Sequence, residues 1–234
     1  MSCYIDIHTH SKNQGNTNVF PVKNILLPLQ EIIPETCFSA GWHPWHAQKA
    51  EIDEIDQSLR VILHAKKLIA LGECGLDRSI TIPMKIQVAV FDRHLLRAIE
   101  YNKPVIIHCV RAFSDLLSVL GRHKGLQHII IHGFTGNTTQ VKQLLRFNCF
   151  FSIGDFVFTH PEKAKELLKA IPSGRLFFET DERKGSVQEI YQKAAALMNM
   201  NEEALIELVF QNFISVFGYG LVGQDPAPAG GRKA

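Results

Sequence analysis

The sequence predicts an α/β protein, a TIM-like (β/α)8 barrel that is distorted because its first helix is missing. Three observations carry this prediction: eight short apolar or β-branched runs, helical patterns between most of them, and a chain long enough for one large core. The chain has 234 residues, of which 46% are hydrophobic and 21% charged. We therefore expect a single barrel domain over residues 1–222, followed by a disordered tail over 223–234 that is rich in Pro, Gly and Ala.

The eight runs are short and nearly continuous in apolar residues, which is typical of parallel strands covered on both faces. They occupy residues 3–7, 23–29, 37–41, 67–73, 103–108, 128–132, 149–154 and 175–179.

Apolar residues at helical spacing predict the elements between the strands. The helical segments are 47–66, 85–100, 113–122, 138–147, 161–171, 187–199 and 202–217. Ser186 with Glu189 forms a capping box before the sixth of these segments, and Asn201 caps the seventh.

One interval does not fit a regular barrel. Too few residues separate Leu29 from Cys37 for a parallel crossover, which takes roughly a dozen or more. Pro28 and Pro34 also oppose a helix there. Either a helix has been lost in this part of the chain, or the second strand is irregular.

Composition excludes several classes of protein. The five cysteines are odd in number and widely spaced, so neither a disulfide framework nor a CxxC zinc module is supported. The net charge of +2 is too small to indicate a nucleic-acid-binding surface by itself. No apolar run reaches 18 residues and no signal peptide is evident, so we expect a cytoplasmic protein without a membrane segment or an obligate protein partner.

Acids and imidazoles gather where the predicted strands end. In a barrel the carboxyl ends of all strands meet at one face, where the chemistry lies. These side chains are Asp6, His8, His10, His43, His46, Glu73, Asp77, His108, His132, Glu179 and Asp181. So many such groups at one end of several strands indicate a functional site.

His8 and His10 are one residue apart, so on a strand both rings leave the same face and can converge on one ion. Imidazole and carboxylate ligands together suit Zn, Mn, Fe or Co better than the all-oxygen shells of Mg or Ca. There are more such groups than one ion needs, so two divalent ions are plausible, with Glu73 as the bridge. We expect each ion to be Zn, Mn, Mg, Fe or Co.

Structural alternatives exist for each of these residues. A histidine on an apolar strand is often only half-buried and hydrogen-bonded, Glu73 can cap a backbone, and Asp181 can cap a helix. We expect Asp6 to be a hydrogen-bonding partner rather than a ligand. The remaining histidines are interpreted as structural: His46, His64, His94, His123, His128 and His160.

The order of the motifs is similar to that of the TatD family of metal-dependent hydrolases, deoxyribonuclease-like members of the amidohydrolase-type barrels. The resemblance covers roughly residues 3–217. It is carried by "DIHTH" (6–10), "GWHP" (41–44), "GECGLD" (72–77), "KPVIIH" (103–108), "HGFTG" (132–136) and "ETD" (179–181).

The resemblance implies two ligand sets for divalent ions. His8, His10, Glu73 and Asp181 would hold one ion, and Glu73, His108 and His132 the other. Asp181 would also accept the proton of the attacking water, so that Asp181 and Glu73 are the expected catalytic residues.

The resemblance also implies substrate contacts. His43 and Glu179 would line the pocket and touch substrate, and Arg111 is a further candidate. In the family the arginine usually follows the histidine after one small residue, whereas "HCVRA" (108–112) inserts one more. Arg78 and Gly133 also replace the usual aromatic and cysteine, and the shortened region 11–36 removes the first helix of the family barrel.

Three hypotheses for function follow. The first is a phosphodiesterase, specifically a deoxyribonuclease, in which a two-metal-activated water attacks phosphorus with Asp181 as base. The second is a metal-dependent hydrolase of an amide, ester or lactone, because the same groups polarise a carbonyl. The third is a metal-binding barrel without turnover. DNA as substrate rests on the resemblance alone, since the sequence reveals no basic groove with stacking side chains.

Overall fold

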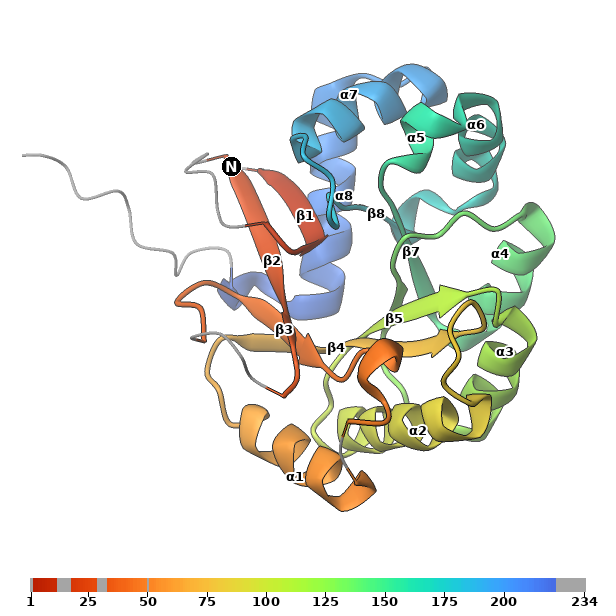
Figure 1. The fold of residues 1–234 in the computed structure, drawn as a ribbon. Coiled ribbons are helices and arrows are strands. Elements are labelled where there is room, and N and C mark those ends of the chain that lie inside the picture. Colours follow the sequence, from red (N-terminus) through yellow and green to blue (C-terminus); the bar gives the residue numbers. More distant parts are fainter. Residues whose placement is uncertain (1, 12–17, 29–32, 50, 222–234) are drawn as a thin grey trace, which may run out of the picture.

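The computed structural model describes residues 2–11, 18–28, 33–49 and 51–221. Its eight strands form one sheet in chain order, each parallel to the next (Figure 1). The strands are β1 (Tyr4–Thr9), β2 (Val19–Leu26), β3 (Phe38–Gly41), β4 (Leu68–Asp77), β5 (Val105–Val110), β6 (Ile129–Ile131), β7 (Cys149–Ile153) and β8 (Leu176–Phe178). All eight predicted strands are thus confirmed.

The helices also follow the predicted pattern. They are α1 (Ile52–Ile62), α2 (Met84–Glu100), α3 (Phe113–Arg122), α4 (Thr138–Leu144), α5 (Phe156–Thr159), α6 (Pro161–Ala170), α7 (Val187–Met198) and α8 (Glu202–Phe217). Short 3-10 helices lie at Pro44–His46, Leu145–Phe147, Ser173–Arg175 and Tyr219–Leu221. The four-residue α5 was not predicted. Ser186 and Asn201 accept hydrogen bonds from the amides of Glu189 and Ala204, so both residues cap their helices, α7 and α8. Of the predicted capping box only this half is found, since the Glu189 carboxylate pairs with Arg183.

The irregular part of the barrel lies where the sequence indicated it. In the described residues between β1 and β3 there is no helix. The second strand starts at Val19 and ends at Leu26, earlier than the predicted 23–29, and it contains Pro21. The expected tail at 223–234 lies outside the described residues.

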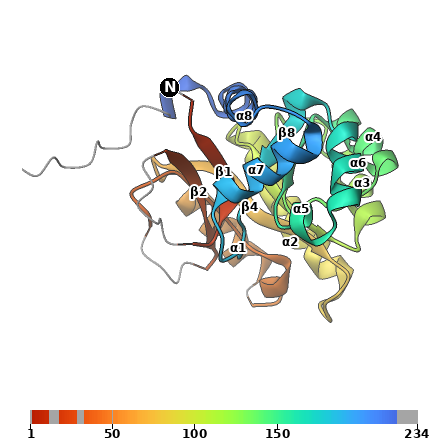
Figure 2. The same ribbon diagram turned by 90° about the horizontal axis from the view of Figure 1, so that it is seen from above.

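The barrel closes where its first and last strands meet. Thr9 and Asp181 form a parallel bridge, in which the Asp181 amide donates to the His8 carbonyl at 3.0 Å and the His10 amide donates to the Asp181 carbonyl at 3.1 Å. Seen from two directions, α7 and α8 lie beside β1 (Figures 1 and 2). The buried Tyr191 hydroxyl of α7 accepts from the Ile5 amide and donates to the Ile5 carbonyl. These bonds fix β1 against the end of the chain.

The core fills the barrel and the layer between strands and helices. Every residue of β4 is buried, as are those of β3, β6, β7 and β8. This explains why these strands read as continuous apolar runs. Among the described residues, no helix is both long and apolar enough to cross a membrane.

Candidate metal centre

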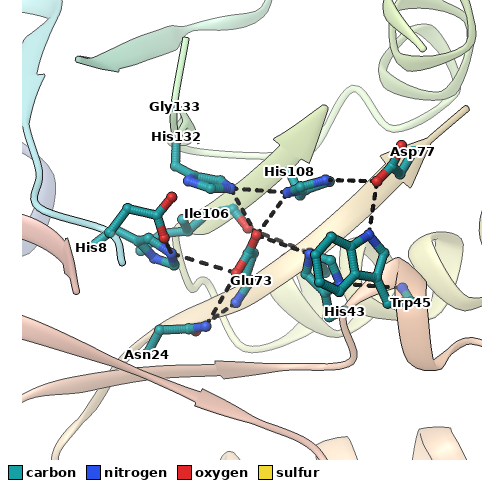
Figure 3. A network of polar contacts seen from close by, with 12 residues as sticks. His8, Asn24, His43, Trp45, Glu73, Asp77, Ile106, His108, His132 and Gly133 are labelled. Carbon is teal, nitrogen blue, oxygen red and sulfur yellow. Dashed lines mark hydrogen bonds and ion pairs between the residues drawn. The ribbon is translucent and has the colours of Figure 1, made fainter. Parts of the chain in front are cut away.

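All six predicted metal ligands come together at the carboxyl ends of the strands. His8 is in β1 and His10 directly follows it, Glu73 is in β4, His108 is in β5, and His132 and Asp181 come shortly after β6 and β8. The side chains of His8, His108 and His132 surround the carboxylate of Glu73 (Figure 3), and the His10 imidazole also lies beside it. Parallel strands in a closed barrel bring them together although they are far apart in the chain.

Two glycines allow β4 to direct Glu73 inward. The register between β4 and β5 shifts between Leu71 and Cys74, so the strand bulges at Glu73. Gly72 has φ +125° and Gly75 has φ +146°, and a Cβ on either would lie 2.2 Å or less from a carbonyl oxygen of β5. Only glycine fits so close to the neighbouring backbone, so the bulge depends on both.

Asn24 of β2 supports the same carboxylate from the other side. Its side-chain oxygen accepts from the Glu73 amide at 2.9 Å, and its amide nitrogen donates to Glu73 Oε2 at 3.3 Å. Ser39 donates to the Asn24 oxygen at 3.2 Å, which fixes the amide orientation. Sequence reasoning missed Asn24, although a polar residue inside the apolar run "NILLPL" was a signal for it.

One ligand set lies between β1 and β8, and we call it the β1/β8 set: His8, His10, Asp181 and Glu73 Oε2. The Nε2 atoms of His8 and His10 lie 3.5 and 3.6 Å from Glu73 Oε2. The same two atoms lie 3.7 and 3.5 Å from Asp181 Oδ1. His8, His10 and Asp181 each offer a ligand atom within 4.8 Å of the other two, and Glu73 Oε2 lies beside both imidazoles.

The other ligand set, the β5/β6 set, consists of His108, His132 and Glu73 Oε1. The His108 Nδ1 and His132 Nε2 atoms are each 2.8 Å from Glu73 Oε1, and they are 3.2 Å from one another. His43 Nε2 approaches the same oxygen at 3.1 Å. The two oxygens of Glu73 therefore face two different groups of imidazoles.

The donor atoms fit divalent ions in number, type and spacing. Around an ion held at about 2.0–2.1 Å, neighbouring ligand atoms in a tetrahedral shell lie roughly 3.4 Å apart. The imidazole–carboxylate separations of the β1/β8 set, 3.5–3.7 Å, are close to this value, whereas the separations in the β5/β6 set, 2.8–3.2 Å, are shorter. Among the donor atoms of the β1/β8 set, His8 Nε2 is buried and has no hydrogen-bond partner among the described residues. Buried polar atoms are normally satisfied, so an ion at this set would give His8 Nε2 the partner that it lacks.

The acids and imidazoles of the centre shift one another's pKa values. Burial opposes ionisation of Glu73, but the surrounding imidazoles, His132 foremost, hold its pKa well below the usual value. Burial likewise opposes protonation of His132, yet Glu73 and Glu179 raise its pKa well above the usual value. Burial and the nearby Glu179 raise the pKa of Asp181.

Two further carboxylates face the outer nitrogens of the β5/β6 imidazoles. Asp77 Oδ2 is 3.5 Å from His108 Nε2, and Glu179 Oε1 is 3.5 Å from His132 Nδ1. Carboxylates in such positions orient a metal-bound imidazole and increase its basicity. Glu179, predicted to touch substrate, is 1% exposed and also accepts from the Gly133 amide, so this geometry favours a supporting position.

Asp6 supports the opposite ligand set. Its carboxylate accepts from the Thr180 amide at 2.9 Å and from the Thr180 hydroxyl at 2.7 Å. Asp6 is therefore a hydrogen-bonding partner, as expected, and its partner is the residue preceding Asp181. Asp181 itself has φ +51°, a conformation that Asp tolerates better than most residues and that often marks functional sites.

The remaining predicted contacts lie around the centre. His43 is buried and accepts from the Trp45 amide through Nδ1. Arg111 is exposed, with φ +51°, and lines a pocket with His132 and Gly133. A cavity of about 390 Å³ adjoins Asp181, and a smaller one on the β2 side is lined by His10 and His46. His46 was interpreted as structural, yet it borders this cavity.

Comparisons with known proteins identify the family of this chain. The family model described as "TatD related DNase" matches residues 16–218. The chain is similar to the uncharacterized metal-dependent hydrolase YabD of Bacillus subtilis (34% identity over 64% of this chain and 61% of YabD). It is also similar to the 3'-5' ssDNA/RNA exonuclease TatD of Erwinia tasmaniensis (32% identity over 63% of this chain and 59% of that protein). The chain thus spans about three-fifths of the length of the curated relatives it matches.

Among solved structures, the fold resembles YJJV, a TatD homologue from Escherichia coli. The TM-score is 0.77 at 21% identity, covering 92% of this chain and 97% of that one. The likeness in fold extends over nearly the whole of both chains. From the match to the family model over residues 16–218, we conclude that this chain belongs to the TatD-related DNase family.

Proposed function

We propose that this protein is a metal-dependent phosphodiesterase that hydrolyses nucleic acid strands, with one divalent ion at the β1/β8 set and a second at the β5/β6 set. The observation that carries the proposal is the position of Glu73. Its Oε2 faces His8 and His10, while its Oε1 faces His108 and His132. A carboxylate placed in this way can bridge two ions.

The substrate class is supported by relatives. The relative from Erwinia tasmaniensis is named a 3'-5' ssDNA/RNA exonuclease. A human relative that is 35% identical, over 60% of this chain and 19% of its own length, is named a 3'-5' RNA nuclease. We extend this class of reaction to the present chain. Single-stranded DNA or RNA with a free 3' end is the expected substrate.

Two divalent ions, when bound, supply Lewis-acid chemistry that favours ionisation of water and neutralises charge at phosphorus. Mixed imidazole and carboxylate ligands suit Zn, Mn, Fe or Co, and Mg less well. The protein contributes the fixed positions of the ligands, since Glu73 is held by Asn24 and by the bulge of β4.

Asp181 is suited to accept the proton of the attacking water. Its Oδ1 faces His8 and His10, and its side chain is 42% exposed, whereas the side chains of His8 and Glu73 are 0% and 5% exposed. A general base must reach solvent and substrate as well as the reacting centre. Among the residues of the β1/β8 set, Asp181 meets both conditions best.

The test compares wild-type protein with Asp181→Asn. The metal content of the purified protein is measured first, and end-labelled DNA and RNA strands are then incubated with each candidate ion. We expect the wild type to shorten linear single strands from the 3' end and to leave circular single strands intact. Asp181→Asn should lower turnover by at least about 100-fold, and chelation should abolish it.

The matched control is Asp115→Asn, which changes an acid paired with Arg78 outside the two ligand sets. It should retain wild-type turnover. Wild-type-like turnover by Asp181→Asn would overturn the assigned role of Asp181. Hydrolysis of lactone or amide compounds without cleavage of any phosphodiester would overturn the proposed reaction.

A further inference from the structure

Trp45 is an exposed aromatic residue directly beside the metal centre. It lies in the 3-10 helix Pro44–His46 after β3 and is 56% exposed. Its ring meets the ring of His43 nearly at right angles, with centroids 4.8 Å apart, and Figure 3 shows the two side by side. His43 in turn contacts Glu73. The indole is therefore one residue away from the carboxylate shared by the two ligand sets.

Hydrogen bonds hold the indole in place. Its Nε1 donates to Asp77 Oδ2 at 2.8 Å, and the Trp45 amide donates to His43 Nδ1 at 3.2 Å. Asp77 is itself fixed, because its Oδ1 accepts two hydrogen bonds from Ser79. An exposed side chain that is already ordered loses little conformational entropy when a ligand packs on it.

The other tryptophan of the chain shows what a packing role looks like. Trp42 is 3% exposed and donates its Nε1 to Ser58, so the core covers almost all of its surface. Trp45 instead keeps more than half of its surface in water, at a cost in hydrophobic free energy. Packing explains Trp42 and does not explain Trp45.

We propose that Trp45 is a stacking platform for an unpaired nucleobase of the nucleotide that carries the scissile phosphate; this inference rests on the proposed function. Every nucleobase has an aromatic face, so stacking on an indole accepts any sequence. A base within a duplex is already stacked and paired, and it must leave the helix to reach such a platform. The platform therefore favours single strands over duplexes.

Because Trp45 is hydrogen-bonded to Asp77, substituting Trp45 can act on the substrate directly or on His108 through Asp77, and two variants separate these effects. Asp77 also lies against His108, so loss of the indole could act on His108 through Asp77 rather than on the substrate. Trp45→Phe keeps an aromatic face and loses the hydrogen bond. Trp45→Leu loses both. Stacking requires the two variants to differ in substrate binding, whereas an effect through Asp77 requires them to behave alike.

The kinetic test uses two single strands that are identical except that one has an abasic site at the nucleotide next to the cleaved bond. We expect Trp45→Leu to raise KM for the normal strand about ten-fold, with kcat within two-fold, and Trp45→Phe to stay near wild type. On the abasic strand all three proteins should share the raised KM. Tyr219→Leu, which changes an exposed aromatic residue at the start of the 3-10 helix Tyr219–Leu221, is the matched control and should have no effect.

A second measurement does not depend on turnover or on the folding of a variant. A nucleobase stacked on Trp45 should quench the tryptophan fluorescence of the wild-type protein, whereas the abasic strand should quench it much less. An equal loss of kcat in Trp45→Phe and Trp45→Leu on both strands, or equal quenching by both strands, would overturn the platform. If no strand is cleaved but base-dependent quenching persists, the proposed reaction fails and the platform stands.

Discussion

Two fully buried histidines of this protein have opposite surroundings. His94, in α2, has both nitrogens satisfied: Nε2 accepts from the Trp42 amide at 2.9 Å, so Nδ1 carries the hydrogen and donates to the Val90 carbonyl at 2.9 Å. His8, at the end of β1, has no hydrogen bond to either nitrogen among the described residues. Both are 0% exposed. Burial alone therefore says little about the role of a histidine, and the partners of its nitrogens say much more.

The largest effect is expected at Glu73, on which all the strand-end imidazoles depend. Glu73→Gln keeps the shape but removes the charge shared by both ligand sets, so neither set should bind its ion tightly. We expect turnover to fall at least about 1,000-fold, with loss of metal measured by elemental analysis of the purified protein. Retention of two ions by this variant would show that Glu73 does not bridge the sets.

His8 and His94 should respond in opposite ways to the same substitution. His8→Leu removes a ligand of the β1/β8 set, and we expect turnover to fall by roughly 100-fold or more. The metal-free variant should be about as stable as metal-free wild type, because the replaced imidazole makes no hydrogen bond among the described residues and an apolar side chain takes its buried place.

His94→Leu is the reciprocal case. Metal content and turnover should stay near wild type, while the free energy of unfolding falls by about 1–3 kcal/mol because the Trp42 amide loses its acceptor. Denaturant unfolding of both variants without metal measures this contrast. A loss of stability in His8→Leu as large as that in His94→Leu would contradict it.

The stability of the protein should also depend on the pH through His94. Burial lowers the pKa of His94 from 6.5 to about 4, although the hydrogen bond to Val90 partly opposes the shift. Between these values the unfolded chain binds a proton that the folded chain does not, so the free energy of unfolding falls as the pH decreases. The loss amounts to roughly 3 kcal/mol between neutral pH and pH 4.

Urea unfolding at a series of pH values, compared between wild type and His94→Leu, measures this contribution. The difference between the two proteins should shrink as the pH decreases. A difference that stays constant from pH 7 to pH 4 would show that His94 is protonated equally in both states.

A smaller effect is expected at Asp77, which faces His108 from outside the β5/β6 set. Asp77→Asn keeps a hydrogen-bond acceptor but removes the charge. Because all three ligands of the β5/β6 set are still present, metal binding there should weaken by only about 10- to 100-fold. Titration with a metal chelator measures the affinity. Asp115→Asn, on the neighbouring helix α3, is the control and should leave the affinity unchanged.

The barrel could be predicted because most of its strands are buried on both faces and therefore appear as unbroken apolar runs. The start of β2 could not, because its burial alternates along the strand and Pro21 interrupts it. The four residues of α5 are too few to show a helical period. The helix α1 is shorter than its apolar pattern, since Glu51 and Glu54 form a capping box that starts it near Ile52.

The ligands could be predicted because the ends of parallel strands meet wherever the barrel closes. The groups that hold these ligands could not, because their contacts cross between strands that the sequence does not pair. Asn24 reaches Glu73 from β2, and Asp6 holds Thr180 at the other end of the chain. The exposed position of Trp45 could not be predicted either, because the motif "GWHPWH" does not indicate which tryptophan faces the core and which faces solvent.

The bridge between Thr9 and Asp181 has a consequence for the synthesis of this protein. Asp6 and Thr180, the pair that supports the bridge, are 174 positions apart in the chain. Contacts of such long separation form late and slow folding. A ribosome exposes His8 and His10 early, but the fourth donor of their set arrives only after β8 has been translated. The β1/β8 set would thus stay incomplete in the nascent chain until the residues after β8 have been added and the ring of strands can close.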